Sequence, residues 1–223
     1  MTAAIMESLQ EELARVGIPG QAKRPAIAKP TAIAHRSKQR HELRRAASEA
    51  TLATILPAQF ESGATWHVLS HGDIDALSYL RHAIAGYGYF DLVAISTWCI
   101  AMPDLLELRK WLDTGKIDRL ELYGGEIFPS QYPDEYALAT RMAAEYGMRL
   151  VVARNHSKVI LARNDKEAAF LVMEGSANVN TNPRIEQTAI SNDADLLNWY
   201  LTFFNGLRSI DKRQAPDASR AGP

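Results

Sequence analysis

The feature that most constrains the fold is an alternation of short apolar runs with amphipathic segments between residues 66 and 153. The apolar runs, expected as strands, are 66–70, 91–97, 118–124 and 148–153, and the segments expected as helices are 75–85, 103–114 and 134–146. The run DLVAIST has no polar alternation, which is typical of a strand covered on both faces. This order predicts an α/β sheet flanked by helices, largely parallel in its first half.

The pattern changes after residue 153. Three apolar runs, 157–162, 168–174 and 186–191, follow with short connections and predict antiparallel strands, and a last helix is expected at 193–206. Before the sheet, the sequence predicts an amphipathic helix at 1–16, a linker at 17–34 and a basic helix at 36–55. The expected organisation is a helical and basic N-terminal extension with its linker (1–60), one mixed-sheet domain (61–207) and a disordered tail (208–223).

Composition fits one domain with an ordinary core, since 47% of the 223 residues are hydrophobic and 23% are charged. The single cysteine, Cys99, excludes an internal disulfide and a cysteine-rich zinc site, and its apolar surroundings predict a core residue. No apolar run has the length of a bilayer span, and the N-terminus does not resemble a secretory signal. We therefore expect a cytoplasmic protein without stable membrane association.

The net charge of −1 hides a basic segment. Residues 21–45 contain eight Lys or Arg against one acid, Glu42. Lys38, Arg40, Arg44 and Arg45 of this segment are candidate contacts to nucleic-acid phosphates, because each neutralised phosphate releases counterions. A solvated helix start followed by a linker remains the alternative.

Residues 155–187 carry the candidate chemistry. His156 and Lys158 are two positions apart, so on a strand both side chains point to the same face. A hairpin over the following two runs would return the chain to Ser176 and Asn178 beside them. An imidazole, an ammonium, a hydroxyl and a carboxamide without a carboxylate cage suit a phosphate ester, with no cofactor and no metal. The imidazole is the candidate nucleophile, and Glu186 is a candidate partner for its other nitrogen.

This pattern resembles the phospholipase D-like superfamily, whose motif is H-x-K-x4-D-x6-G-S-x-N. The matching segments are HSK (156–158) and GSAN (175–178), and Glu186 stands where the family has a downstream acid. Arg163 occupies the position of the family's aspartate, and the gap before Gly175 is five residues longer than in the pattern. The tract GSANVNTNPRIEQ is also similar to that of phage-encoded and prophage-encoded members.

The resemblance implies a site and an assembly. In the implied site His156 forms a phosphohistidine, Lys158 and Asn178 hold the phosphate, Ser176 supports the loop and the phosphate, Gly175 joins the phosphate-binding set, and Glu186 orients a histidine. The family's chemistry needs two histidines, one to attack and one to protonate the leaving oxygen. Residues 1–150 hold no second copy of the motif, so we expect a twofold homodimer with both motifs at its axis.

The expected function is a metal-independent phosphodiesterase, with nucleic acid as the preferred substrate. The alternatives are a non-catalytic nucleic-acid-binding protein and a phospholipid hydrolase or transferase. The sequence leaves open DNA or RNA, single or double strand, and any sequence preference.

Other candidate positions are weaker. His67 and His71 resemble a metal pair, but no third ligand follows at a suitable spacing. The segment 123–126 follows a strand, where ligands bind in open sheets, although its glycines also suit a plain turn. Trp66 and Trp98 are expected in the core.

Overall fold

The computed structural model describes residues 37–72, 74–179 and 184–211. The chain divides into a unit of residues 1–37 and a compact unit of residues 38–223, which contains the sheet. The helix expected at 1–16 and the linker expected at 17–34 lie outside the described residues.

The described chain builds one seven-stranded mixed sheet in the order β1-β7-β6-β5-β2-β3-β4. The strands are β1 (Thr65–Ser70), β2 (Phe90–Thr97), β3 (Ile117–Gly125), β4 (Arg149–Ala153), β5 (Val159–Asn164), β6 (Ala169–Gly175) and β7 (Glu186–Asn192). The pairs β2–β3 and β3–β4 are parallel, whereas β5, β6 and β7 pair antiparallel in sequence order. The α/β class and the change from parallel to antiparallel pairing are therefore confirmed.

The largely parallel first half is confirmed for β2, β3 and β4, but β1 does not belong to it. β1 is an edge strand that pairs antiparallel with β7, in the register Trp66↔Ile190. The neighbour of β2 on its other side is β5, not β1. A strand's own sequence encodes its apolar pattern but not its partner, which depends on contacts far along the chain. Asn192 supplies such a contact, because its amide nitrogen donates to the Phe60 carbonyl at 2.8 Å and ties the end of β7 to the chain before β1.

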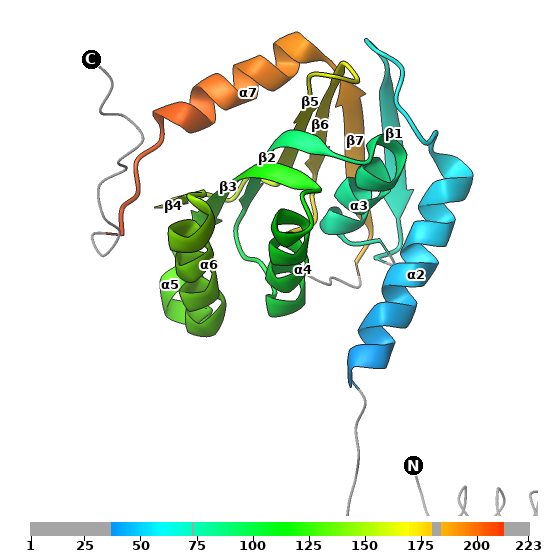
Figure 1. Cartoon of the computed structure of the whole chain (residues 1–223). Coiled ribbons are helices and arrows are strands. Elements are labelled where there is room, and N and C mark those ends of the chain that lie inside the picture. The colour runs from blue at the N-terminus through cyan, green and yellow to red at the C-terminus, as the bar shows by residue number, and fades with distance from the viewer. Residues whose placement is uncertain (1–36, 73, 180–183, 212–223) are drawn as a thin grey trace, which may run out of the picture. The chain divides into compact units, whose positions relative to one another are not determined.

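Helices cover both faces of the sheet (Figure 1). The helices are α2 (Ser37–Ile55), α3 (Ala76–Tyr87), α4 (Met102–Asp113), α5 (Phe128–Gln131), α6 (Pro133–Tyr146) and α7 (Ala194–Gly206). Figure 1 shows α7 on the face opposite to α3, α4 and α6. The short α5 is not apparent in the sequence because four residues carry no helical periodicity. No helix in the described part of the chain is long and apolar enough to cross a membrane.

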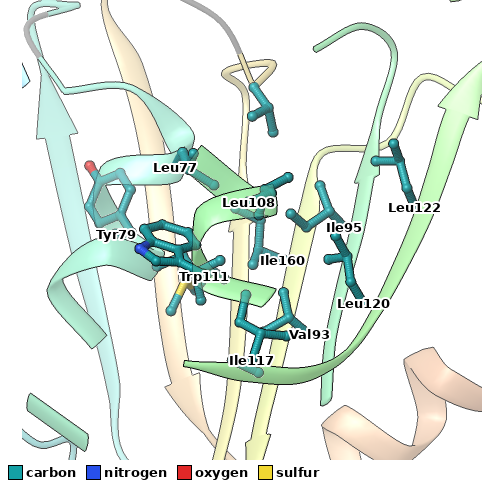
Figure 2. Close-up of a cluster of buried hydrophobic side chains, with 14 of the residues drawn as sticks. Leu77, Tyr79, Val93, Ile95, Leu108, Trp111, Ile117, Leu120, Leu122 and Ile160 are labelled. Atoms are coloured by element: carbon teal, nitrogen blue, oxygen red, sulfur yellow. The ribbon is translucent and has the colours of Figure 1, made fainter. Parts of the chain in front are cut away.

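Two apolar cores explain the uninterrupted run of β2. Val93 and Ile95 of β2 point into the larger core under α2, α3, α4 and α6, part of which Figure 2 shows. Leu92 and Ala94, on the alternate positions, join the smaller core under α7. Each fully buried aliphatic side chain contributes about 1.5–3 kcal/mol. Both faces of β2 are thus packed against a core, and this packing holds the end of the strand at Thr97 in place.

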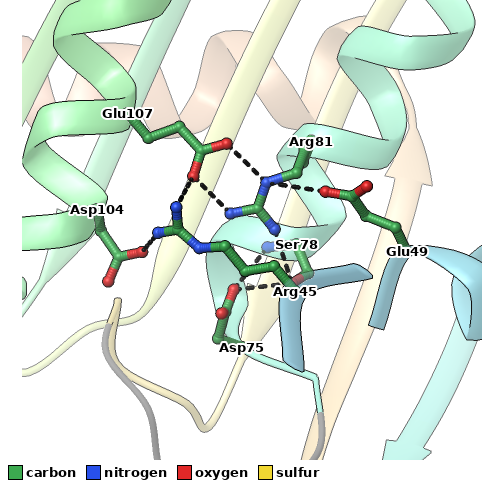
Figure 3. A network of polar contacts seen from close by, with 7 residues as sticks. All are labelled: Arg45, Glu49, Asp75, Ser78, Arg81, Asp104 and Glu107. Atoms are coloured by element: carbon green, nitrogen blue, oxygen red, sulfur yellow. Dashed lines mark hydrogen bonds and ion pairs between the residues drawn. The ribbon is translucent and has the colours of Figure 1, made fainter. Parts of the chain in front are cut away.

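A network of ion pairs joins α2, α3 and α4 (Figure 3). The Arg45 guanidinium lies 2.7 Å from Asp104 Oδ1 and 2.6 Å from Glu107 Oε2. Arg81 binds the same Glu107 at 2.7 Å and approaches Glu49 at 3.3 Å. Arg45, one of the candidate phosphate contacts, is therefore half-buried and bound to two carboxylates of α4.

Asp104 is the most deeply buried carboxylate of this network. Burial raises its pKa to about 7, the nearby Asp75 adds to the rise, and Arg45 opposes it. Between the ordinary pKa of 3.8 and about 7, the folded chain binds a proton at Asp104 that the unfolded chain has released. Ionisation of this group therefore lowers the free energy of unfolding as the pH rises through that window.

The last described residues lie beside β4. The Ile210 backbone nitrogen donates to the Val152 carbonyl at 2.8 Å, and the Tyr136 hydroxyl donates to Asp211 Oδ2 at 2.6 Å. The rest of the tail expected at 208–223 lies outside the described residues.

Candidate active site

The His156 and Lys158 side chains meet just before β5. Lys158 Nζ lies 3.0 Å from His156 Nδ1 and donates to the His156 carbonyl oxygen at 2.6 Å. His156 is exposed and Lys158 is half-buried. The sequence places both on a strand, but β5 begins only at Val159. The two side chains therefore meet in the irregular segment 155–158 before β5 and not by strand alternation.

The β5–β6 hairpin brings GSAN back beside HSK, as the sequence predicts. The Gly175 backbone nitrogen donates to the Lys158 carbonyl at 3.0 Å, next to the ladder pair Val159↔Glu174. A Cβ on Gly175 would lie 3.0 Å from the Gln187 carbonyl oxygen and 3.2 Å from Thr188 Oγ1. A side chain at position 175 would therefore press against β7, and the longer hairpin still joins the two motif segments.

Ser176 is held by the start of β7. Its hydroxyl donates to Glu186, and it accepts from the Gln187 backbone nitrogen at 3.1 Å. The carboxylate of Glu186, which the sequence predicts to orient a histidine, accepts this hydrogen bond from Ser176. Glu186 also lies close enough to Lys158 to favour the charged ammonium. Ser176 and Glu186 thus form a rigid corner of the site.

Asn178 joins the GSAN segment to the end of β2. Its Oδ1 lies 3.3 Å from the Trp98 backbone nitrogen and 3.4 Å from Thr97 Oγ1, both of which donate. The next residue, Val179, forms an isolated parallel bridge with Ile100. With the amide oxygen accepting from the backbone, the amide nitrogen is the group of Asn178 suited to donate to a phosphate oxygen.

Asn155 fixes the HSK segment, although no motif predicts this role. Its Nδ2 donates to Ser96 Oγ at 2.9 Å and to the Tyr123 carbonyl at 2.8 Å, at the ends of β2 and β3. Its Oδ1 accepts from the Ser157 backbone nitrogen at 3.0 Å and from Ser157 Oγ at 2.7 Å. Ser96 Oγ and Ser157 Oγ are 2.6 Å apart and close the ring. The residue between His156 and Lys158 is thus attached to the sheet.

Trp98 lies at the site and not in the core, which corrects the sequence-based expectation. Its ring centroid is 5.4 Å from that of His156, with 54° between the planes, and the residue is half-buried. The other tryptophan expected in the core, Trp66, is half-buried and packs against the larger core. Its ring meets the Phe60 ring edge-on, with the two ring centroids 5.1 Å apart. The sequence does contain one indication that Trp98 belongs to the site, because this residue directly follows the end of a strand.

Burial and charge act in opposite directions on Lys158. Desolvation lowers the pKa of its ammonium, whereas Cys99 and Glu186 oppose the shift. Burial raises the pKa of the Cys99 thiol, and this residue is 3% exposed, which agrees with the expected core position.

Lys158 also lines a narrow pocket, together with residues of the GSAN segment. The pocket is lined by Ala76, Tyr79, Ser96, Lys158, Val159, Ile160, Met173, Gly175, Ala177, Val179 and Thr188.

The remaining candidates lie elsewhere. Arg163, at the position of the family's aspartate, pairs with Leu92 at the far end of β5 and approaches Asp165 at 3.4 Å. Among the described residues, no group of three or more His, Cys, Asp or Glu side chains is arranged to hold a metal ion, so His67 and His71 form no such cluster. The side chains of Lys38, Arg40 and Arg44 lie outside the described part.

Comparison with known proteins gives similarity of fold alone. No family model matches the chain, and no curated protein sequence matches it. The archaeal chromatin protein TrmBL2, whose structure is described as showing a novel mode of DNA binding, superposes with a TM-score of 0.50. The identity is 13%, over 92% of this chain and 80% of that chain. A phosphatidylserine synthase from Haemophilus influenzae Rd KW20 has a TM-score of 0.45 and 15% identity, over 78% of this chain and 46% of that chain.

Proposed function

We propose that this chain is a metal-independent phosphodiesterase of the phospholipase D-like type, acting on nucleic acid. The observation that carries the proposal is the contact between His156 and Lys158, 3.0 Å from nitrogen to nitrogen, directly beside the GSAN segment. A nucleophile next to a cation, with a loop of small donor residues, is an arrangement that suits phosphoryl transfer.

The proposed reaction has two steps. A ring nitrogen of His156 attacks phosphorus, and the phosphorus–oxygen bond to the leaving group breaks. The leaving oxygen takes a proton from the partner subunit's His156. That histidine, now neutral, accepts a proton from water, whose oxygen attacks the phosphohistidine and releases His156. Lys158 and Asn178 bind the non-bridging oxygens, whose charge grows in each transition state.

The electrostatics of the site favour chemistry without a divalent cation. The Lys158 ammonium occupies the position next to the nucleophile, and it would repel a metal ion placed there. Its burial strengthens its attraction for a phosphate, because the surrounding dielectric constant is lower than that of water. The positive charge that a metal ion supplies in other nucleases is assigned here to Lys158.

A second copy of the chain completes the proposed site, since each chain carries one motif. Leu69 and Ile185 support a surface for it, because they are 78% and 69% exposed and a group of exposed apolar side chains is typical of an interaction surface. Leu69 pairs in register with Gln187, and Ile185 precedes Glu186. Both therefore lie at the end of the sheet where Glu186 meets Ser176, and a partner seated there would reach the site.

The experiment is cleavage of labelled single-stranded and double-stranded DNA and RNA in excess chelator. Wild-type chain is expected to cleave at least one of them, and His156→Ala and Lys158→Ala are expected to lose the activity. Lys166→Ala, at an 89% exposed side chain in the β5–β6 turn, is the matched control and should retain it. Cleavage that disappears with chelator, or that survives in His156→Ala, would refute the proposal.

The rival function is nucleic-acid binding without catalysis. It is favoured by the fold shared with TrmBL2, which is described as binding DNA, and by Arg163 at the position of the family's aspartate. For that function, His156→Ala would bind DNA as tightly as the wild-type chain, and neither would cleave it.

A further inference from the structure

Trp98 is the aromatic side chain nearest to the proposed nucleophile. It is the first residue after β2, and its ring lies 5.4 Å from the His156 ring. The planes are inclined at 54°, so the imidazole does not cover the indole as a parallel stack would. The residue is half-buried, so part of it is accessible to solvent.

The position of this indole is fixed by the backbone around it. A Cβ on Gly125 would lie 2.5 Å from Trp98 Cδ1, so the ring edge rests against a residue that has no side chain. The Gly125 nitrogen donates to the Trp98 carbonyl at 3.2 Å, and the Trp98 nitrogen donates to Asn178 Oδ1 at 3.3 Å. Trp98 is thus bonded to a predicted phosphate ligand through its backbone and contacts the nucleophile through its ring.

A half-buried indole held in place by the backbone around it suits the binding of another flat ring. Bases stack on aromatic side chains through their faces, and each such contact strengthens binding appreciably in proteins that bind single strands. In a duplex both faces of a base are covered by its neighbours, so an intact duplex offers no face to a side chain.

We propose that Trp98 is a stacking platform for an unpaired base beside the scissile phosphate, and that the substrate is therefore single-stranded nucleic acid. The proposal rests on the proposed function for the position of the phosphate. Trp98 in this role contacts substrate and determines specificity, whereas His156 and Lys158 act on phosphorus.

The test measures binding in a His156→Ala background, where the proposed chemistry is absent and its failure has no effect on the result. The probes are a labelled oligothymidylate, an oligouridylate and an abasic oligomer of the same length and charge, compared by fluorescence anisotropy in chelator. The variants are Trp98→Phe, which keeps an aromatic face, and Trp98→Leu, which keeps apolar volume. Trp199→Leu, at a tryptophan that is 64% exposed on α7, is the control.

The chain with Trp98 is expected to bind at least one of the two base-containing oligomers about tenfold more tightly than the abasic one, and Trp98→Leu should remove this preference. Trp98→Phe should keep most of it, and the Trp199 control should keep all of it. Equal affinity for all oligomers, or a preference that survives Trp98→Leu, would overturn the stacking proposal. A preference as proposed, together with no cleavage by the chain with His156 restored, would overturn the phosphodiesterase and keep the platform.

Discussion

Asn155→Asp tests whether the hydrogen-bonded ring around HSK positions the proposed nucleophile. The substitution keeps the shape of the side chain and its acceptor for Ser157. It removes the donor to the Tyr123 carbonyl at 2.8 Å and to Ser96 Oγ at 2.9 Å, and it places a carboxylate oxygen against that carbonyl. Each lost neutral hydrogen bond costs roughly 1 kcal/mol, and the repulsion between the new carboxylate oxygen and the Tyr123 carbonyl oxygen adds to this loss.

We therefore expect Asn155→Asp to lower the free energy of unfolding by about 2–4 kcal/mol. The segment that carries His156 then loses its attachment to β2 and β3, and a displacement of about 1 Å at a reacting group lowers the rate roughly 100-fold. The expected effect is on kcat, with KM nearly unchanged, because Lys158 and the GSAN segment still bind the phosphate. Asn155→Ala should reduce kcat at least as much.

The assay is steady-state cleavage of a labelled oligonucleotide in chelator, together with urea unfolding of each variant. Asn198→Asp makes the same chemical change at an exposed position of α7 and should alter neither measurement. An Asn155→Asp chain that is folded at the assay temperature and retains wild-type kcat would refute the positioning role. An effect confined to KM would refute it equally.

Three further predictions concern stability and assembly. Arg45→Met should destabilise the fold by about 2–4 kcal/mol at pH 8, where Asp104 is ionised in its buried site. At pH 5, where Asp104 is protonated, the loss should be only about 1 kcal/mol. An equal loss at both pH values in urea unfolding would contradict the raised pKa of Asp104. Gly125→Ala should lower kcat and thermal stability together, since its Cβ would meet the indole at 2.5 Å; Gly206→Ala, which meets nothing within 4 Å, should leave kcat unchanged, and an active Gly125→Ala chain would show that the indole position is unimportant. Leu69→Asp with Ile185→Asp should convert a dimer to a monomer in light scattering and abolish cleavage; a wild-type chain that is monomeric at micromolar concentration, or a doubly substituted dimer, would contradict the shared site.

The sequence predicts the described fold well where one segment determines its own structure. The apolar run of β2 indicates burial on both faces, and Leu92 and Val93 do enter different cores. The edge position of β1 was not predictable in the same way, because the pairing Trp66↔Ile190 joins residues more than a hundred positions apart. Strand order is a tertiary property, and apolar periodicity does not contain it.

The candidate site shows the same division. The adjacency of Lys158 and Gly175 follows from a hairpin that the sequence contains, whatever its length. The roles of Asn155 and Trp98 depend on β2 and β3 ending beside that hairpin, which only the folded sheet determines. Arg45 shows the opposite case, since its basic surroundings in the sequence conceal two carboxylates of α4 that bind it in the structure.

The central claim is that His156 attacks phosphorus, and the most direct measurement is detection of the covalent intermediate. Wild-type chain is mixed briefly with a labelled oligonucleotide in chelator, denatured in alkali, which preserves phosphohistidine, and mapped by mass spectrometry. We predict a nucleotide adduct on the peptide that contains His156, absent from His156→Ala and unchanged in Lys166→Ala. Cleavage without an adduct, an adduct on another residue, or no cleavage and no adduct at all would contradict the account.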